Sequence, residues 1–174
     1  AVFENADVFV MTLGLNEAWQ YLPDGTYISR NPRNKNLNGL LTHRTLSVEE
    51  NIDYLQRFVD VVRAHNPNIK LVVTVSPVPF LATGRADEYH VITANGHSKA
   101  VLRVAAQEIV ERNENVFYFP SYEVVTVCSP EIWTEDQRHV HPDAIRRVMA
   151  TFDEMFLTDE AKAKVQAASA AGEA

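Results

Sequence analysis

A short polar turn follows the first apolar run of the sequence and carries groups suited to stabilising an anion. Val8–Leu13 is apolar, and Gly14-Leu15-Asn16-Glu17 comes directly after it. Glycine permits a tight turn with its backbone open to a ligand, and the side-chain amide of Asn16 could donate a hydrogen bond to a developing oxyanion. The alternative is an asparagine that satisfies its own turn. Gly14 and Asn16 are therefore candidate site residues.

A second cluster of ionisable residues lies in Glu135–Pro142, near the carboxyl end. Asp136 precedes His139 by three residues and could orient one ring nitrogen, which leaves the other as a general base. In the alternative without chemistry, His141 caps the following helix and Asp136 pairs with Arg138. A metal ion bound by Asp136 and the two histidines is a third alternative, although a zinc site needs further ligands.

Three serines stand where a nucleophile could lie: Ser76, Ser98 and Ser121. No Gly-x-Ser-x-Gly segment surrounds Ser76, and Ser-Pro commonly starts a turn. Ser98 is expected in the first turn of a helix, where hydroxyls often bond backbone groups. The single cysteine, Cys128, follows an apolar run and is expected to be a small core residue. Structural roles are thus the expectation for all four.

Three short apolar runs predict the strands that position these residues. They are rich in Val, Phe and Ile and lack helical periodicity: Val8–Leu13, Ile69–Val75 and Val116–Phe119. Because they are nearly continuous rather than alternating, we expect a parallel sheet covered on both faces. The segment Ala18–Thr45 contains a turn at Pro23-Asp24-Gly25 and is expected to leave the sheet as a hairpin.

Helical patterns separate the strands. The clearest has apolar residues three and four apart, and Ser47 with Glu50 forms a capping box at its start. The expected helices are Val48–His65, His97–Glu111, Asp143–Phe156 and Asp159–Ala170. Alternating strands and helices predict an open α/β layer architecture, in which ligands bind beyond the carboxyl ends of the strands. The segments expected there are Gly14–Asn16, Ser76–Phe80, Pro120–Glu123 and Thr134–His141.

The composition restricts the classes of partner. The chain has 174 residues, 46% hydrophobic and 22% charged, which is ordinary for one globular domain. Its 16 Lys and Arg stand against 23 Asp and Glu, and the net charge of −7 argues against nucleic acid as a partner. No apolar run approaches the ~20 residues that span a bilayer. No signal-peptide pattern is visible at the start. The sequence leaves the compartment open, with a cytoplasmic location slightly favoured, and it does not indicate the oligomeric state.

Five short segments occur in the order of a known set of motifs. The strand that ends in Gly14-Leu15-Asn16-Glu17-Ala18-Trp19 resembles the Gly-x-Asn block of SGNH (GDSL-like) hydrolases. Four further segments follow it: Thr74–Pro79, Ala94–Arg103, Tyr118–Glu123 and Asp136–Pro142. Together they resemble the GSCFA family within the SGNH hydrolases, over most of residues 6–156.

The resemblance implies a site made of residues from two of these segments. Asn16 resembles the oxyanion-hole amide, and Gly14 resembles its supporting turn. His139 matches the general base and Asp136 the residue that orients it, with His141 as the competing base. Such enzymes need no metal ion and no organic cofactor, so the resemblance implies none here.

The resemblance also implies a fold and a division of the chain. The fold would be a flavodoxin-like, three-layer α/β/α sheet of the SGNH hydrolase type, parallel and without its first strand. It would occupy residues 1–157, and an Ala-rich helix or tail would occupy residues 158–174.

One family feature is absent from the sequence. The Gly-Ser-Cys-Phe-Ala segment that names the family, whose serine is the expected nucleophile, does not occur in these 174 residues. The resemblance therefore implies a serine esterase or O-acyl (acetyl) transferase whose nucleophile lies outside the chain, acting on acylated carbohydrate or another small-molecule ester. This chain alone would then be inactive. The alternatives are a non-catalytic SGNH-like domain that binds a glycan or a partner protein, and a metal-dependent hydrolase.

Overall fold

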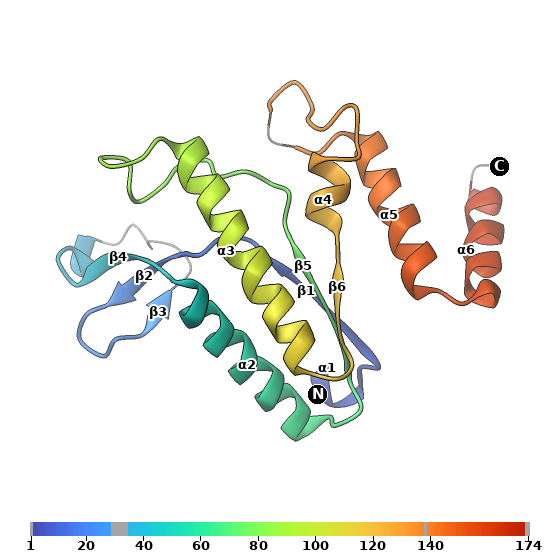
Figure 1. Ribbon diagram of the computed structural model, residues 1–174, viewed down its shortest axis with the longest axis horizontal. Coiled ribbons are helices and arrows are strands. Elements are labelled where there is room, and N and C mark those ends of the chain that lie inside the picture. The colour runs from blue at the N-terminus through green and yellow to red at the C-terminus, as the bar shows by residue number, and fades with distance from the viewer. Residues whose placement is uncertain (1, 29–34, 138, 173–174) are drawn as a thin grey trace. The chain divides into compact units, whose positions relative to one another are not determined.

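The computed structural model describes residues 2–28, 35–137 and 139–172, in two compact units. The first unit is residues 1–118 and the second is residues 119–174. Each unit is described by itself below, with the elements labelled in Figure 1. In chain order, the elements are α1 (Val2–Asn5), β1 (Val8–Leu13), β2 (Glu17–Tyr21), β3 (Tyr27–Ile28), η1 (Lys35–Leu37), β4 (Leu41–Thr45), α2 (Val48–His65), β5 (Lys70–Val75), α3 (Val91–Arg112), β6 (Val116–Phe119), α4 (Ser121–Thr126), α5 (Pro142–Phe156) and α6 (Asp159–Gly172).

The three predicted strands form one sheet in the order β1-β5-β6. β1 and β5 pair in parallel, with Phe9 opposite Leu71 and Leu13 opposite Val75. The expected fold class is confirmed: the chain is a mixed α/β protein with a parallel sheet, of the flavodoxin-like α/β/α type. The expected continuous burial holds for β5 beyond its first residue. The edge strand β1 alternates between exposed and half-buried residues, so the described residues leave one of its faces uncovered, and the prediction of a sheet covered on both faces fails there. Val8 and Val10 on β1 remain 49% and 46% exposed.

The core of the first unit lies where α2 and α3 pack side by side against this sheet (Figure 1). Val59 of α2, Val73 of β5 and Ile109 of α3 are completely buried there. Each such side chain contributes roughly 1.5–3 kcal/mol by leaving water. Phe9 of β1 and Phe58 of α2 extend the core, with ring centroids 5.7 Å apart.

The sequence predicts the first residue of one long helix correctly and that of the other too late. α2 begins at Val48 as expected, and both hydrogen bonds of the capping box between Ser47 and Glu50 are present. α3 begins at Val91, six residues before the predicted start at His97, and the side chain of His90 caps it. Gly96 lowers the helix propensity of this first turn and a half. Ala94 in this segment is 1% exposed, and its packing outweighs the low helix propensity of Gly96.

The segment between the first two parallel strands leaves the sheet, as expected. It forms a separate antiparallel sheet in the order β3-β2-β4, so it contains three strands rather than the two of a simple hairpin. Trp19 of β2 lies opposite both Ile28 of β3 and His43 of β4. At the predicted turn, Gly25 has a φ of 77°, a left-handed conformation that glycine adopts without strain.

The second unit contains α4, α5 and α6. The predicted helices Asp143–Phe156 and Asp159–Ala170 correspond to α5 and α6, and Pro142 is the first residue of α5. Phe119, Phe152 and Phe156 form an aromatic cluster, with centroids 5.2 Å apart for the first pair and 5.0 Å for the last. Cys128 is exposed, so its prediction as a core residue is wrong: it follows the end of α4 rather than lying within an element.

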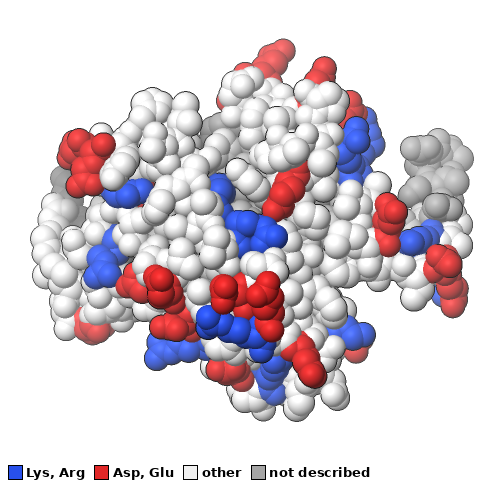
Figure 2. Space-filling model, viewed as in Figure 1, with Lys and Arg blue, Asp and Glu red and all other residues white. Residues whose placement is uncertain are grey.

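The hydrophobicity of the helices and the distribution of surface charge bear on the partners of the described residues. None of their helices is long and apolar enough to cross a membrane. On the face shown in Figure 2, Lys and Arg side chains lie among Asp and Glu side chains rather than gathering into one basic patch.

Candidate functional site

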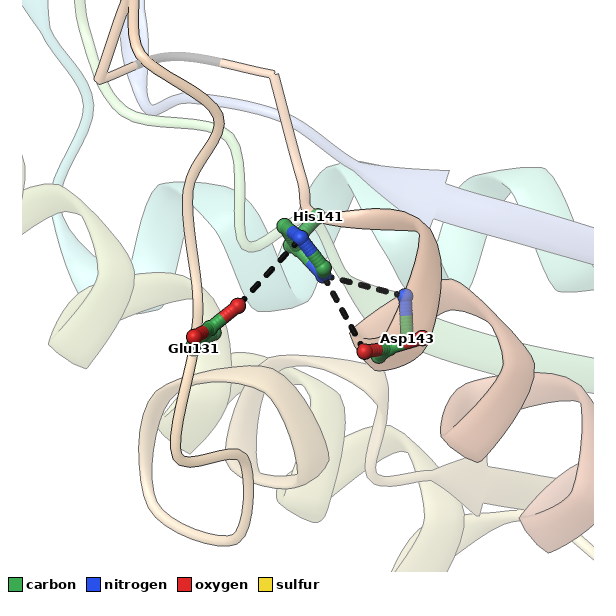
Figure 3. Close-up of side chains that lie close together, drawn as sticks. All are labelled: Glu131, His141 and Asp143. Carbon is green, nitrogen blue, oxygen red and sulfur yellow. Dashed lines mark hydrogen bonds and ion pairs between the residues drawn. The ribbon is translucent and has the colours of Figure 1, made fainter.

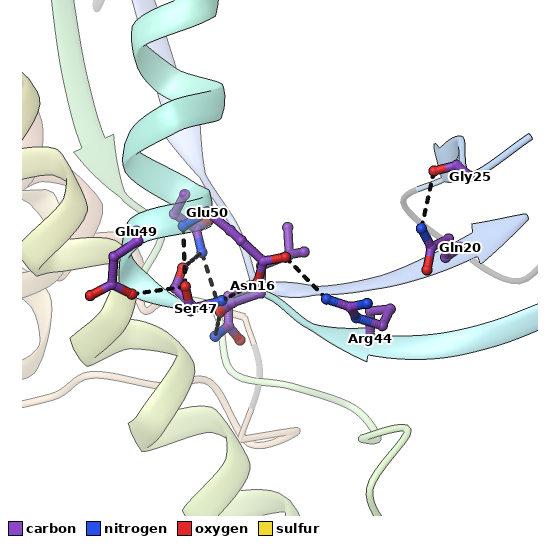
Figure 4. A network of polar contacts seen from close by, with 9 residues as sticks. Asn16, Gln20, Gly25, Arg44, Ser47, Glu49 and Glu50 are labelled. Carbon is purple, nitrogen blue, oxygen red and sulfur yellow. Dashed lines mark hydrogen bonds and ion pairs between the residues drawn. The ribbon is translucent and has the colours of Figure 1, made fainter.

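Asn16 is held firmly at the carboxyl end of β1 and is only 1% exposed. Its Nδ2 donates to the carbonyl oxygen of Leu46 at 2.9 Å, and its own carbonyl accepts from the Leu46 amide at 2.8 Å. These bonds join β1 to the start of α2, where Ser47 and Glu50 lie beside Asn16 (Figure 4). Its Oδ1 is buried and has no hydrogen-bond partner among the described residues. Asn16 therefore bonds a distant segment through its side chain, rather than its own turn.

Helix α3 contacts the same turn through two consecutive residues that sequence reasoning did not assign to the site. The Nζ of Lys99 donates to the carbonyl oxygen of Gly14 at 2.8 Å. The Oγ of Ser98 accepts from the amide of Asn16 at 2.9 Å. Burial lowers the pKa of Lys99 to about 8. The expected contact of Ser98 with a backbone group is present, although Ser98 lies inside α3 rather than in its first turn.

Glu17, the next residue, carries a nearly buried carboxylate that ties a loop to the antiparallel sheet. It accepts from the hydroxyl of Thr83 at 2.5 Å and from the amide of Gly84 at 3.0 Å. It also lies 3.2 Å from Nε2 of His43 and 3.8 Å from Nε of Arg85. The loop after β5 is thus held against β2 and β4. Sequence reasoning assigned no separate role to Glu17, because its partners lie 26 to 68 positions away along the chain.

Asp136 and His139 lie together in the second unit, as their spacing predicts. The Nδ1 of His139 contacts a carboxylate oxygen of Asp136, and the backbone amide of His139 donates to the other oxygen at 3.0 Å. The hydroxyl of Thr134 donates to the same carboxylate at 2.8 Å. Gln137 adopts a φ of 57° inside this tight turn. The His139 side chain is 82% exposed, so the ring's other nitrogen is open to solvent.

His141 has different contacts, which make it a structural residue in this arrangement. Its Nδ1 accepts from the amide of Asp143 at 3.2 Å and caps the first turn of α5, as the non-chemical alternative predicts. Its Nε2 lies 3.3 Å from Glu131, so both ring nitrogens have partners (Figure 3). The alternative ion pair of Asp136 with Arg138 lies outside the described residues.

The described residues contain one group of three that could hold a metal ion: Glu131, His141 and Asp143. This group differs from the set that the sequence suggested, since it omits His139 and Asp136. Glu131 and Asp143 are largely exposed, and Asp143 already pairs with Arg146. Glu131 and Asp143 also line a cavity of about 350 Å³.

Each of the three candidate serines is buried or bonded to a backbone amide. The Oγ of Ser76 accepts from the amide of Val78 at 3.2 Å, which is the turn contact that Ser-Pro predicts. Ser98 is completely buried and Ser121 is buried at the first residue of α4. A buried hydroxyl with a backbone partner is poorly placed for attack on a substrate.

The site residues predicted from the sequence fall in both units. Gly14 and Asn16 belong to the first, whereas Asp136 and His139 belong to the second. The structure therefore brings together the two members of each pair, and each pair is described within its own unit.

The parallel sheet, with a polar turn after β1, places the chain in the flavodoxin-like class of α/β proteins. Within that class, residues 1–152 match the model of the GSCFA family, and this range includes all four predicted site residues. The chain therefore belongs to the GSCFA family. No curated protein matches the chain.

Proposed function

We propose that this chain is the oxyanion and acid–base portion of an SGNH-type serine esterase or O-acyltransferase, acting on acylated carbohydrate or a similar small ester. The contact of Asp136 with His139 carries the proposal. A carboxylate on one imidazole nitrogen fixes the tautomer and leaves the other nitrogen as a base for a hydroxyl nucleophile. The exposure of His139 supports this role because an incoming hydroxyl can reach its ring.

The nucleophile in this proposal is a serine outside the 174 residues. The engaged hydroxyls of Ser76 and Ser98 support an outside position, because each already accepts a backbone hydrogen bond. In the reaction, the serine attacks the ester carbonyl while His139 accepts its proton. His139 then returns the proton to the leaving alcohol, which leaves the acyl group on the serine; water or an acceptor hydroxyl, deprotonated by His139, removes it and regenerates the serine. One hydrogen of Asn16 Nδ2 donates to Leu46, so the second hydrogen of this amide is the one that the proposal assigns to the oxyanion between these steps.

His139 is the preferred base over His141. Both ring nitrogens of His141 have partners within the second unit, and one of them caps α5. A base needs a lone pair that is open to the substrate. This difference in contacts supports His139 in that role and gives His141 a structural one.

The experiment that tests the function is intact-mass analysis after incubation with a fluorophosphonate probe, which reacts with activated serines. It should be run on the full-length protein and on the 174-residue chain. We expect an adduct on the full-length protein only. A labelled 174-residue chain would place an activated serine within it, with Ser76 the first to examine. No label on either protein would replace the proposal with a non-catalytic domain that binds a glycan or a partner protein.

A further inference from the structure

Lys99 is a buried lysine with a single neutral partner. It lies in the middle of α3 and is 2% exposed, whereas lysine is almost never fully buried unless it is paired. Its Nζ donates to the carbonyl oxygen of Gly14 at 2.8 Å. Within the part of the chain that the structure describes, no carboxylate forms an ion pair with it. Burial without a counter-charge costs free energy, and it lowers the pKa of Lys99 to about 8.

Ser98, the preceding residue, contacts the other end of the same turn. It is completely buried, and its Oγ accepts from the amide of Asn16 at 2.9 Å. Two neighbouring residues of one helix thus bond the first and third residues of the turn Gly14–Asn16. These contacts join positions more than 80 residues apart in the sequence.

The opposite side of the turn is held as well. Both the backbone carbonyl and the side-chain Nδ2 of Asn16 bond Leu46, so three polar groups of Asn16 have fixed partners. An amide that stabilises an oxyanion must be held within about 0.5 Å of its working position. If this turn served only to reverse the chain, its polar groups could bond to water, and the costly burial of the Lys99 ammonium would not be needed.

We propose that Ser98 and Lys99 are positioning residues that hold the Gly14–Asn16 turn in the geometry that the proposed reaction needs. They contact no substrate: Ser98 acts through Asn16, and Lys99 acts through Gly14. The Lys99 bond also polarises the peptide that joins Gly14 to Leu15, because hydrogen-bonded groups strengthen one another in series. The contacts themselves are independent of the proposed function, whereas the role assigned to the turn rests on it.

The structural part is tested by amide hydrogen exchange, measured by NMR on the isotopically labelled chain. Lys99→Met keeps the length and apolar stem but removes the donor, and Ser98→Ala removes the acceptor. Lys70→Met, at an exposed lysine of β5, controls for loss of charge. Val101→Ala, at a buried residue of α3, controls for a weakened helix. We expect exchange in the turn to accelerate about fivefold to tenfold in the two test variants relative to the controls. Equal exchange in test and control variants would overturn the inference.

The functional part is tested by the kinetics of ester hydrolysis with p-nitrophenyl acetate, on the full-length protein carrying the same substitutions. We expect kcat to fall about tenfold in Lys99→Met with KM nearly unchanged, because the ester still binds but its oxyanion is less well stabilised. Lys99→Arg, which keeps a cationic donor, should recover part of kcat. A rise in KM alone would overturn the positioning role. Altered exchange in a full-length protein without serine reactivity would keep the contacts and reject the proposed function instead.

Discussion

Two histidines of the second unit lie two positions apart and differ in the groups that their ring nitrogens contact. His139 has one nitrogen against Asp136 and the other toward solvent, whereas His141 has a backbone amide on one side and Glu131 on the other. The difference follows from local geometry. His139 ends a tight turn, while His141 occupies the N-cap of α5, where a side-chain acceptor satisfies a free amide.

This contrast predicts that two alanine substitutions in the full-length protein affect different properties, one the turnover and the other the stability. His139→Ala should lower the proposed esterase turnover by about 10²–10⁴ with almost no change in melting temperature, because it removes the proposed base and its side chain is 82% exposed. His141→Ala should lower the free energy of unfolding by about 1 kcal/mol, because α5 loses its cap. Turnover rates and thermal melts of both variants check the prediction. Full turnover in His139→Ala, with loss in His141→Ala, would transfer the role of base to His141.

At the scale of elements, a loop and a sheet meet so closely that one position excludes a side chain. A Cβ on Gly84 would overlap the imidazole ring of His43, whose Nε2 lies 3.2 Å from the carboxylate of Glu17. Gly96, inside α3, has open space where a Cβ would lie. Two glycines of the same unit therefore provide a matched comparison.

We expect Gly84→Ala to lower the free energy of unfolding by about 1–3 kcal/mol, because either His43 or the loop must move and the contacts of Glu17 weaken. Gly96→Ala should raise it by up to about 1 kcal/mol, since alanine favours a helix interior more than glycine does. Chemical denaturation of both variants measures the two changes. If Gly84→Ala is as stable as the unmodified protein, the close packing of the loop against β4 is refuted.

The sequence predicted the elements whose signals are local. The apolar runs located β1, β5 and β6, and the capping box located the first residue of α2. The start of α3 was missed because His90 is an uncommon cap and Gly96 interrupts the pattern, while tertiary packing stabilises this turn.

In the candidate site, too, the local contacts could be predicted from the sequence and the long-range contacts could not. The contact of Asp136 with His139 could be predicted, because three positions of chain limit how far apart the two side chains can lie. The contacts of Gly14 with Lys99 and of Asn16 with Ser98 could not, because they depend on how α3 packs against β1. A lysine inside a helix normally indicates an exposed face, so Lys99 gave no signal of burial.

At the scale of the whole molecule, the buried ammonium of Lys99 gives folding stability a specific dependence on pH. The pKa of Lys99 is about 8 in the folded chain and near the ordinary 10.5 when the chain is unfolded. Between these values the unfolded chain holds more protons, so the free energy of unfolding rises with pH. Below pH 8 both states hold the proton, and the cost of burying the charge is present in full.

Lys99→Met removes this titration. The free energy of unfolding of the unmodified protein, minus that of Lys99→Met, should therefore increase from pH 7 to pH 10, because only the unmodified protein is relieved of a buried charge. Urea denaturation at both pH values measures the difference. Lys70→Met serves as the control and should follow the unmodified protein, because its lysine is exposed in the folded chain. Parallel pH profiles for Lys99→Met and the unmodified protein would show that the Lys99 ammonium keeps its ordinary pKa, and hence that it reaches water rather than the Gly14 carbonyl alone.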